Sequence, residues 1–210
     1  DTGEILVSNP GIDMVSSTGS TRAGSHIAAI AGSQIKRMAL ELGGKSAALV
    51  LPGAELPTAV KATLASCMLN SGQTCSSMTR LLVQRDMLPE VERLVRDLID
   101  TYRMGDPADA ATRLGPLVSA DQREKVQAMI DNAVAAGARS VGANPPVPDH
   151  GFFIPATVLW DITPPMTIAM EEVFGPVLCI MCYDDIEDGI ALDNGTENGL
   201  AGALWGPVTP

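Results

Sequence analysis

The feature that most constrains the fold of this chain is a regular alternation of short apolar runs with segments of helical periodicity. Short buried strands are predicted at residues 14–17, 38–40 and 47–51, and further strands at residues 80–84, 157–160 and 177–183. Helices are predicted between the early runs, over residues 20–31 and 56–69. Strands that alternate with helices are typical of an α/β architecture with a largely parallel sheet, because parallel strands need long crossovers.

Two further segments are predicted to be amphipathic helices. The first has Asp86 as a possible N-cap and places its apolar residues at i, i+3, i+4 spacing: Val91, Leu94, Val95, Leu98 and Tyr102. The second begins at Ser119 with Gln122 three residues later, which is the pattern of a capping box, and Gly137 is predicted to end it. Residues 142–151 contain three prolines and are predicted to form a surface loop.

Charge and composition exclude several classes of function. The chain has 210 residues and a formal charge of −11, with 14 Lys and Arg against 25 Asp and Glu, so a nucleic-acid phosphate backbone would be repelled. No run approaches the roughly 20 apolar residues of a membrane helix, and no secretory signal is recognised. Four cysteines in a chain of this length are not a disulfide framework, so a reducing cytoplasm is expected. Because the chain begins without Met and ends without a closing element, we expect a fragment truncated at both ends.

Two glycine-containing motifs in the first 45 residues could carry chemistry. Residues 17–24 lie between a strand and a helix, where free N–H groups and the helix dipole favour an anion such as a phosphate. A simple turn with an N-cap is the alternative. The second motif, residues 41–45, places Glu41 at the end of a strand beside two glycines, where a carboxylate could act as a general base. Its alternative is a surface glutamate paired with Lys45.

A cysteine follows a helix in the polar turn of residues 70–75. Polar turn-forming neighbours indicate that Cys75 is exposed, and a free thiol of this kind can act as a nucleophile. Cys67 lies in an apolar helical pattern and is predicted to be in the core. Cys179 and Cys182 have the spacing of a redox or zinc pair, but core packing is favoured because residues of a strand alternate between its faces.

The remaining candidates are two histidines and an acidic turn. His26 and His150 are far apart in sequence and are predicted to be surface or capping residues, so no metal site is predicted. In residues 170–176 a carboxylate could accept hydrogen bonds from ribose hydroxyls and Phe174 could contact a planar ring. A solvated acidic turn is the alternative.

Taken in order, these motifs resemble the NAD(P)-dependent aldehyde dehydrogenase superfamily. The resemblance covers nearly all 210 residues and rests on residues 18–24, 41–45, 72–75, 114–117 and 171–176, with a weaker match at 198–202. It implies an α/β, aldehyde dehydrogenase-like fold. Residues 1–44 would be the C-terminal part of a Rossmann-like cofactor-binding domain, and residues 45–210 would be the catalytic domain, incomplete at its C-terminus. Asn198 stands where the family usually has tyrosine.

The resemblance also implies a mechanism, in which an aldehyde is oxidised to a carboxylic acid. Cys75 would attack the aldehyde to give a thiohemiacetal, a hydride would pass to NAD or NADP, and Glu41 would activate the water that hydrolyses the thioester. The implied cofactor-binding residues are Gly19 and Ser20 at the pyrophosphate, Leu42 near the nicotinamide, Glu172 on the nicotinamide ribose and Phe174 against the cofactor.

The same resemblance implies a cytoplasmic homodimer or homotetramer as the parent enzyme, with an aldehyde as its substrate. Glu41 argues against the branch of the superfamily that passes the acyl group to coenzyme A. A thioester or ester hydrolase that uses Cys75 and Glu41 without redox is one alternative, and a catalytically silent structural or interaction module is another. The isolated chain is expected to be nearly inactive, because the asparagine of the oxyanion hole lies outside it and such a donor contributes roughly 3 to 4 kcal/mol.

Overall fold

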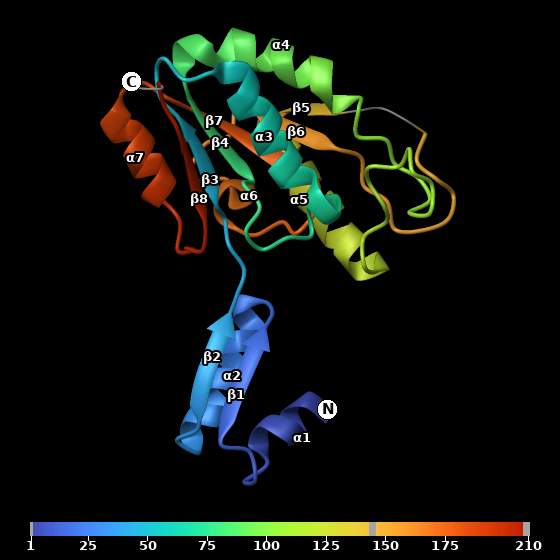
Figure 1. The fold of residues 1–210 in the computed structure, drawn as a ribbon, viewed down its shortest axis with the longest axis vertical. Helices are drawn as coiled ribbons and strands as arrows, with labels where there is room; N and C mark the ends of the chain where they lie inside the picture. The colour runs from blue at the N-terminus through green and yellow to red at the C-terminus, as the bar shows by residue number, and fades with distance from the viewer. Residues whose placement is uncertain (1, 143–145, 208–210) are drawn as a thin grey trace. The chain divides into compact units, whose positions relative to one another are not determined.

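The computed structural model describes residues 2–142 and 146–207, and it divides into two compact units, Asp1–Gly43 and Gly44–Pro210. The predicted loop at residues 142–151 lies partly outside the described residues. Its first residue, Gly142, instead ends the strand Arg139–Gly142, and residues 146–151 contain no helix or strand. Figure 1 shows the elements of each unit as a ribbon. No helix in the described ranges is both long enough and apolar enough to cross a membrane.

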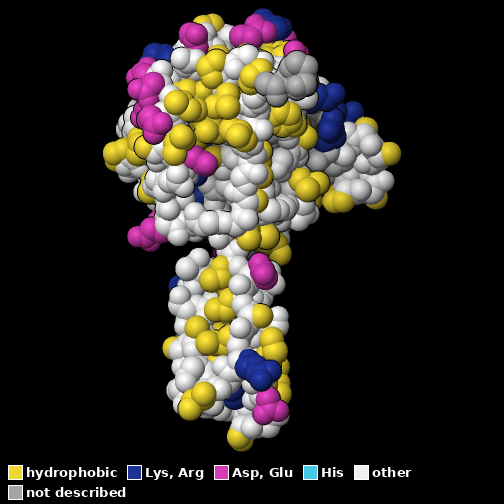
Figure 2. Space-filling view, turned by 60° about the vertical axis from the view of Figure 1, so that its left-hand side comes forward, with side chains coloured by type: hydrophobic (Ala, Val, Ile, Leu, Met, Phe, Trp, Pro, Cys, Tyr) yellow, Lys and Arg dark blue, Asp and Glu magenta, His cyan; other side chains and the backbone are white. Residues whose placement is uncertain are grey.

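The N-terminal unit is a β–α–β arrangement preceded by a short helix. In chain order it consists of α1 (Thr2–Ser8), β1 (Met14–Thr18), α2 (Thr21–Ser33) and β2 (Arg37–Glu41). β1 and β2 are parallel, with Thr18 opposite Glu41 at their carboxyl ends. Figure 2 shows hydrophobic side chains at the surface of this unit. Its exposed large apolar residues include Ile5, Leu6, Met14, Ile35 and Met38.

The C-terminal unit is built on one sheet. Its strands within the described residues are β3 (Ala47–Val50), β4 (Arg80–Gln84), β5 (Arg139–Gly142), β6 (Thr157–Trp160), β7 (Val177–Tyr183) and β8 (Gly202–Trp205). Their order across the sheet is β5-β6-β7-β4-β3-β8, and β5 alone among these described strands runs antiparallel to its neighbour. The expected α/β fold with a largely parallel sheet is therefore confirmed.

Helices cover both faces of this sheet (Figure 1). The helices of the unit are α3 (Leu56–Met68), α4 (Leu88–Ile99), α5 (Ala120–Ala135), α6 (Thr167–Met170) and α7 (Ile186–Asn194), with 3₁₀ turns η1 (Leu69–Gly72) and η2 (Arg85–Met87). The apolar faces of α3 and α4 share a core with alternate residues of the strands, such as Leu81 and Ile180. α5 and α6 share a second core with the intervening residues, such as Leu82 and Met181. The central strands are thus buried on both faces, as parallel sheets usually are.

The structure contradicts the predicted N-cap of α4 and confirms the predicted ends of α5. Asp86 is not the N-cap of α4, because it lies inside η2 and the cap residue is Met87, which makes no side-chain capping bond. Ser119 does cap α5, since its Oγ accepts a hydrogen bond from the Gln122 N–H at 3.1 Å. Gly137 follows the helix with a φ of +106°, so the helix ends where predicted.

The sequence analysis did not identify α1, α6, α7, β5 or β8. β5 and β8 are edge strands of four residues, and neither contains a fully buried residue. β5 has no apolar run, and β8 has only the short run at residues 203–205. α7 begins at Asp185, whose side chain accepts a hydrogen bond from the Asp188 N–H, but the helix buries only Gly189. Such elements form because a neighbouring strand or core receives them, which a local pattern does not reveal.

Candidate active site

The turn between β1 and α2 has the geometry of an anion-binding helix start. Ser20 is the N-cap, and its Oγ accepts a hydrogen bond from the Ala23 N–H at 3.2 Å. The Gly19 N–H donates to the carbonyl of Glu41 at 3.0 Å, which ties the turn to the end of β2. Gly19 and Ser20 are both exposed, so the first turn of α2 can present its N–H groups and positive dipole end to an anion.

The end of β2 packs directly against the first turn of α2. A Cβ on Gly24 would lie 2.5 Å from a methyl carbon of Leu42, so only glycine allows this contact without rearrangement of the leucine. Leu42 is half-buried there. Glu41 is the last residue of β2, and its side chain is exposed within this chain, so the residue is free to face a reactant but is not in the apolar pocket that a buried base would occupy.

In the C-terminal unit, the backbone before Cys75 has an unusual conformation. Asn70, Ser71 and Gly72 all have positive φ values, at 51°, 56° and 75°. Two side-chain hydrogen bonds tie this loop to residues 115–118: Ser71 Oγ donates to the Gly115 carbonyl at 2.9 Å, and Gln73 Oε1 accepts from the Val118 N–H at 2.9 Å. The segment 114–118 thereby fixes the turn that delivers Cys75, whose own side chain is partly exposed.

The same loop lies against the segment that carries Glu172 and Phe174. A Cβ on Gly72 would lie 2.0 Å from the carbonyl carbon of Gly175, and one on Gly175 would lie 2.7 Å from Val126 of α5. Gly72 and Gly175 therefore allow the two backbones and α5 to stack without side chains between them. Phe174 itself has a φ of 56° and is half-buried.

Side chains of α5 bind the carbonyls of this second segment. Gln122 Nε2 donates to the carbonyls of Val173 at 3.0 Å and Phe174 at 2.9 Å. Lys125 Nζ donates to the Glu172 carbonyl at 3.2 Å. In a full capping box the Gln122 side chain would return to the N-cap backbone, but here it holds the strained Phe174 turn instead. The spacing of Ser119 and Gln122 predicted that Gln122 belongs to a capping box, whereas in the structure its side chain binds the carbonyls of Val173 and Phe174.

Gly44 is the point at which three of the sequence motifs meet. Its N–H donates to Glu172 Oε1 at 3.4 Å. A Cβ at this position would lie 3.0 Å from the Cys75 carbonyl oxygen, 3.1 Å from the Gly199 carbonyl oxygen and 3.2 Å from Leu200 Cβ. The structure thus brings Cys75, Glu172 and residues 199–200 together around one glycine, while Gly19, Ser20, Glu41 and Leu42 belong to the other compact unit.

Lys45, the residue after Gly44, is buried rather than part of a surface ion pair. Its Nζ has no hydrogen-bond partner in the described structure, and burial lowers the pKa of the ammonium from its ordinary value. An ammonium without partners is costly in the protein interior, so its charge state is sensitive to what lies around it. Negative charge on Cys179, Cys67 or Glu172 would raise the pKa of Lys45 and so oppose the effect of burial.

The four cysteines separate by environment. Cys67 and Cys179 are fully buried, and burial raises the pKa of Cys67 to about 12 and raises that of Cys179 as well, so both stay protonated and inert. The prediction that Cys182 is in the core is wrong in part, because it is only partly buried near the end of β7. All four thiols are free.

Neither histidine is placed for metal binding. His26 is exposed with its Nε2 3.7 Å from a carboxylate oxygen of Glu4, and His150 is exposed. No group of three or more His, Cys, Asp or Glu side chains in residues 2–142 and 146–207 could hold a metal ion.

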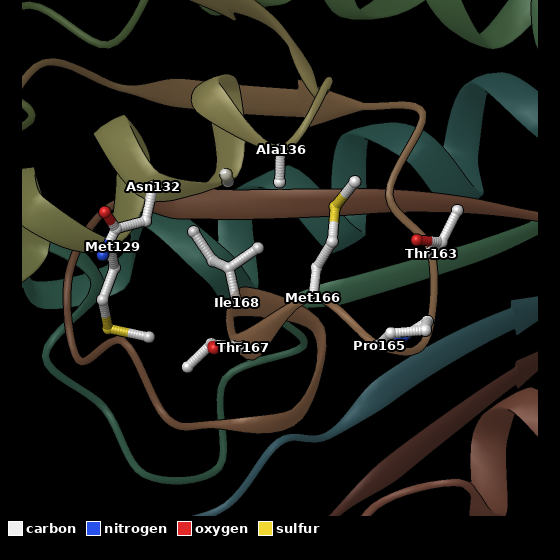
Figure 3. A pocket seen from close by; sticks show the side chains of 9 residues that line it. Met129, Asn132, Ala136, Thr163, Pro165, Met166, Thr167 and Ile168 are labelled. Atoms are coloured by element: carbon white, nitrogen blue, oxygen red, sulfur yellow. The ribbon is translucent and has the colours of Figure 1, made fainter.

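A hollow of about 360 Å³ lies elsewhere, between α5 and α6. Figure 3 shows its lining, in which Met129 and Asn132 come from α5 and Met166 and Ile168 from α6 and the turn before it. None of the predicted site residues lines it.

The family model described as the aldehyde dehydrogenase family matches residues 1–208 of this chain. The chain belongs to the aldehyde dehydrogenase family. Among the curated relatives of this aldehyde dehydrogenase chain, 3-succinoylsemialdehyde-pyridine dehydrogenase of a Pseudomonas species is 44% identical over 203 residues. Betaine aldehyde dehydrogenase of Rhizobium leguminosarum is 41% identical over 208 residues. The matches cover 95% and 98% of this chain, and 43% of each relative, so the chain spans less than half of their length.

Solved structures of aldehyde dehydrogenases share the fold. A cysteine-to-alanine mutant of aldehyde dehydrogenase C from Pseudomonas syringae, in complex with NAD+ and octanal, has a TM-score of 0.93 at 40% identity. The match covers 98% of this chain and 43% of that one. Betaine aldehyde dehydrogenase from Staphylococcus aureus in complex with NAD+ has a TM-score of 0.93 at 33% identity, covering 99% of this chain and 42% of that chain.

Proposed function

We propose that the protein containing this chain oxidises an aldehyde to a carboxylic acid with NAD or NADP, using Cys75 as the nucleophile and Glu41 as the general base. The observation that carries the proposal is the meeting at Gly44, where the backbone of the cysteine loop and the Glu172 carboxylate contact the same residue. A reaction between a covalently held substrate and a cofactor needs both to be fixed against one another to within a fraction of an ångström. Gly44 provides such a common support.

The residues present fit a dinucleotide cofactor. The exposed first turn of α2 suits a pyrophosphate at Gly19 and Ser20, and the half-buried Glu172 can accept hydrogen bonds from ribose hydroxyls. Leu42 and Phe174 are half-buried apolar side chains that suit the nicotinamide half of the cofactor. NAD or NADP, when bound, would supply the hydride acceptor. The NAD+ complexes of the related structures support this choice.

The steps assigned to this chain's residues balance as follows. The Cys75 thiolate attacks the carbonyl carbon, and a C–S bond forms as the carbonyl becomes a thiohemiacetal oxyanion. NAD or NADP, when bound, would accept a hydride from this carbon, so that a thioester would remain on Cys75. Glu41 removes a proton from a water molecule, which attacks the thioester, and the C–S bond breaks to release the carboxylic acid and the cysteine. The net change is aldehyde, water and oxidised cofactor to acid, reduced cofactor and a proton.

The same proposal assigns a different role to each of the two units. The N-terminal unit would be the end of a Rossmann-like cofactor domain, since its β1–α2 turn carries the anion site, and the C-terminal unit would be the catalytic domain. We further propose a cytoplasmic location, with which four free thiols agree, and a homodimer or homotetramer.

The experiment that tests the function is reduced-cofactor formation by the full-length gene product with a panel of aldehydes and with NAD and NADP. Wild-type protein should form NADH or NADPH, and Cys75→Ala should abolish it. Glu41→Gln should form one burst of reduced cofactor and then stall with an acyl group on Cys75, which mass spectrometry detects.

Two outcomes would overturn the proposal. The first is folded wild-type protein that reduces neither cofactor with any aldehyde, which would favour a silent module. The second is hydrolysis of an activated ester without any redox activity, which would favour a hydrolase.

A further inference from the structure

Arg80 is a charged side chain buried at the start of β4. Its side chain is 3% exposed. The guanidinium donates three hydrogen bonds to backbone carbonyls: Nε to Lys45 at 2.9 Å, Nη1 to Leu192 at 2.6 Å and Nη2 to Asp193 at 2.9 Å. Burial lowers the pKa of this group, so the carbonyls offset a real desolvation cost.

These three bonds join two segments that are far apart in sequence. Lys45 lies two residues before the start of β3, while Leu192 and Asp193 lie in the last turn of α7. A cation suits the end of a helix, where the carbonyls carry the negative end of the dipole. The carboxylate of Asp193 contributes less, because it lies 3.7 Å from Nη2 and is 44% exposed. Arg80 therefore holds the two segments mainly through their backbone carbonyls rather than through the ion pair with Asp193.

Both segments continue to the residues that meet at Gly44. Gly44 precedes Lys45, and the chain after α7 runs to Gly199 and Leu200, which contact Gly44. The same segment is held at a second point, since Asn198 Nδ2 donates to the Met170 carbonyl at 3.1 Å, just before the turn that carries Glu172. Arg80 thus fixes the spacing between the backbone at residues 44–45 and the backbone at residues 192–200, which meet at Gly44.

We propose that Arg80 is a positioning residue for the cofactor half of the site. It holds the Lys45 carbonyl, and so the Gly44 N–H, in register with residues 195–201, and the Gly44 N–H in turn orients the Glu172 carboxylate. The kinetic consequence rests on the proposed function, in which Glu172 binds the nicotinamide ribose. The backbone consequence does not rest on it.

The test compares Arg80→Met and Arg80→Lys with wild type in the full-length gene product. Met keeps most of the packing volume and removes every donor, while Lys keeps the charge and can reach only part of the fork of carbonyls. We expect the KM for NAD to rise about tenfold or more in Arg80→Met and less in Arg80→Lys, with a smaller change in the KM for aldehyde. Loss of a charge-assisted hydrogen bond network of this kind is large enough to give such a factor.

Two control variants separate positioning from general stability. Arg85 follows the other end of β4 and binds Asp184 through two hydrogen bonds at the surface, so Arg85→Met should leave both KM values unchanged. Asp193→Asn removes the ion pair but keeps the backbone carbonyl, and should change the KM for NAD less than twofold. A purely structural Arg80 would lower the active fraction and leave KM unchanged, and this result would overturn the proposal.

Hydrogen–deuterium exchange on the same proteins gives a readout that needs no activity. Arg80→Met should speed exchange of the amides in residues 43–46 and 195–201, with α3 and α4 unchanged. If wild type forms no reduced cofactor, the proposed function fails, and exchange alone decides whether Arg80 holds these backbones. Unchanged exchange in both segments would overturn the positioning role. If Arg80→Met does not fold, Arg80→Lys supplies both measurements.

Discussion

Gly72 and Gly175 are in direct backbone contact, with the position of a Cβ on Gly72 only 2.0 Å from the carbonyl carbon of Gly175. One glycine belongs to the turn that delivers Cys75, and the other to the segment that follows Glu172 and Phe174. Gly72 also has a φ of 75°, which side chains disfavour. The contact therefore depends on the absence of a side chain at Gly72, while a Cβ on Gly175 would instead overlap Val126 of α5.

Replacing Gly72 by alanine should displace the cysteine turn. The new methyl overlaps backbone atoms that no rotamer change can move, so we expect a loss of several kcal/mol of stability, above the roughly 1 to 3 kcal/mol usual for strained backbone. Activity per folded molecule should also fall, because the cysteine loop and the Glu172 segment can no longer stack. Denaturant unfolding and steady-state kinetics measure the two effects.

Gly32 is the matched control for that substitution. It lies inside α2, and no atom is within 4 Å of a Cβ built there. Gly32→Ala should therefore be neutral or stabilising by about 0.5 to 1 kcal/mol, since alanine is the better helix former. Equal losses at Gly72 and Gly32 would show that the backbone contact has no special importance.

The four thiols should react in an order set by burial. Cys75 is partly exposed in a polar turn, whereas Cys67 and Cys179 are fully buried with raised pKa values. Brief iodoacetamide treatment of folded protein, followed by peptide mass spectrometry, should modify Cys75 before Cys67 and Cys179. Pre-labelling of Cys75 should remove activity. Modification of Cys67 at the rate of Cys75 would contradict the packing of α3.

The buried Cys67 thiol should make stability depend on pH in the alkaline range. Its pKa is raised from 9.0 to about 12 in the folded protein, so above pH 9 the unfolded thiol releases its proton and the folded one does not. The stabilising contribution is therefore complete below pH 9 and is lost as pH rises towards 12. At pH 10 the loss is about 1 kcal/mol.

Cys67→Ala isolates this contribution. The variant lacks the thiol, so its denaturant midpoint should fall less between pH 7.5 and pH 10 than that of wild type. The comparison uses the change with pH, because the lost sulfur atom lowers stability equally at both values. Parallel pH profiles for the two proteins would contradict the assigned environment of Cys67.

Two variants at the start of α5 should distinguish the helix cap made by Ser119 from the hydrogen bonds by which Gln122 holds the Phe174 turn. Ser119→Ala removes the bond to the Gln122 N–H and should cost about 1 kcal/mol of stability with little effect on the KM for cofactor. Gln122→Glu keeps the length of the side chain but replaces its donor by a carboxylate facing the carbonyls of Val173 and Phe174. We expect this variant to raise the KM for cofactor, because the Glu172 segment is no longer held. Thermal unfolding and kinetics measured on the same samples check both.

Much of the fold was predictable because its central elements are locally encoded. The segments 80–84, 157–160 and 177–183 each contain a continuous apolar run, and the structure places β4, β6 and β7 over the same residues. The end of α5 was predictable because Gly137 has the positive φ that a helix C-terminus commonly needs. The edge strands β5 and β8 were not predictable, since β5 has no apolar run and β8 has only a short one. An edge strand forms when a neighbour offers free hydrogen-bonding groups.

The sequence by itself determined the order of the motifs along the chain and the membership of the aldehyde dehydrogenase family. It also determined the residue types of Cys75, Glu41 and Glu172. Only the tertiary structure assigned Gly44 as the common contact of Cys75 and Glu172, turned the Gln122 side chain from its helix cap to the Phe174 turn, and buried Arg80 among three carbonyls. The physical reason is that a glycine, an amide or a guanidinium has many possible partners. Which one it finds depends on the backbones that long-range packing brings within hydrogen-bonding distance, and no local pattern records those distances.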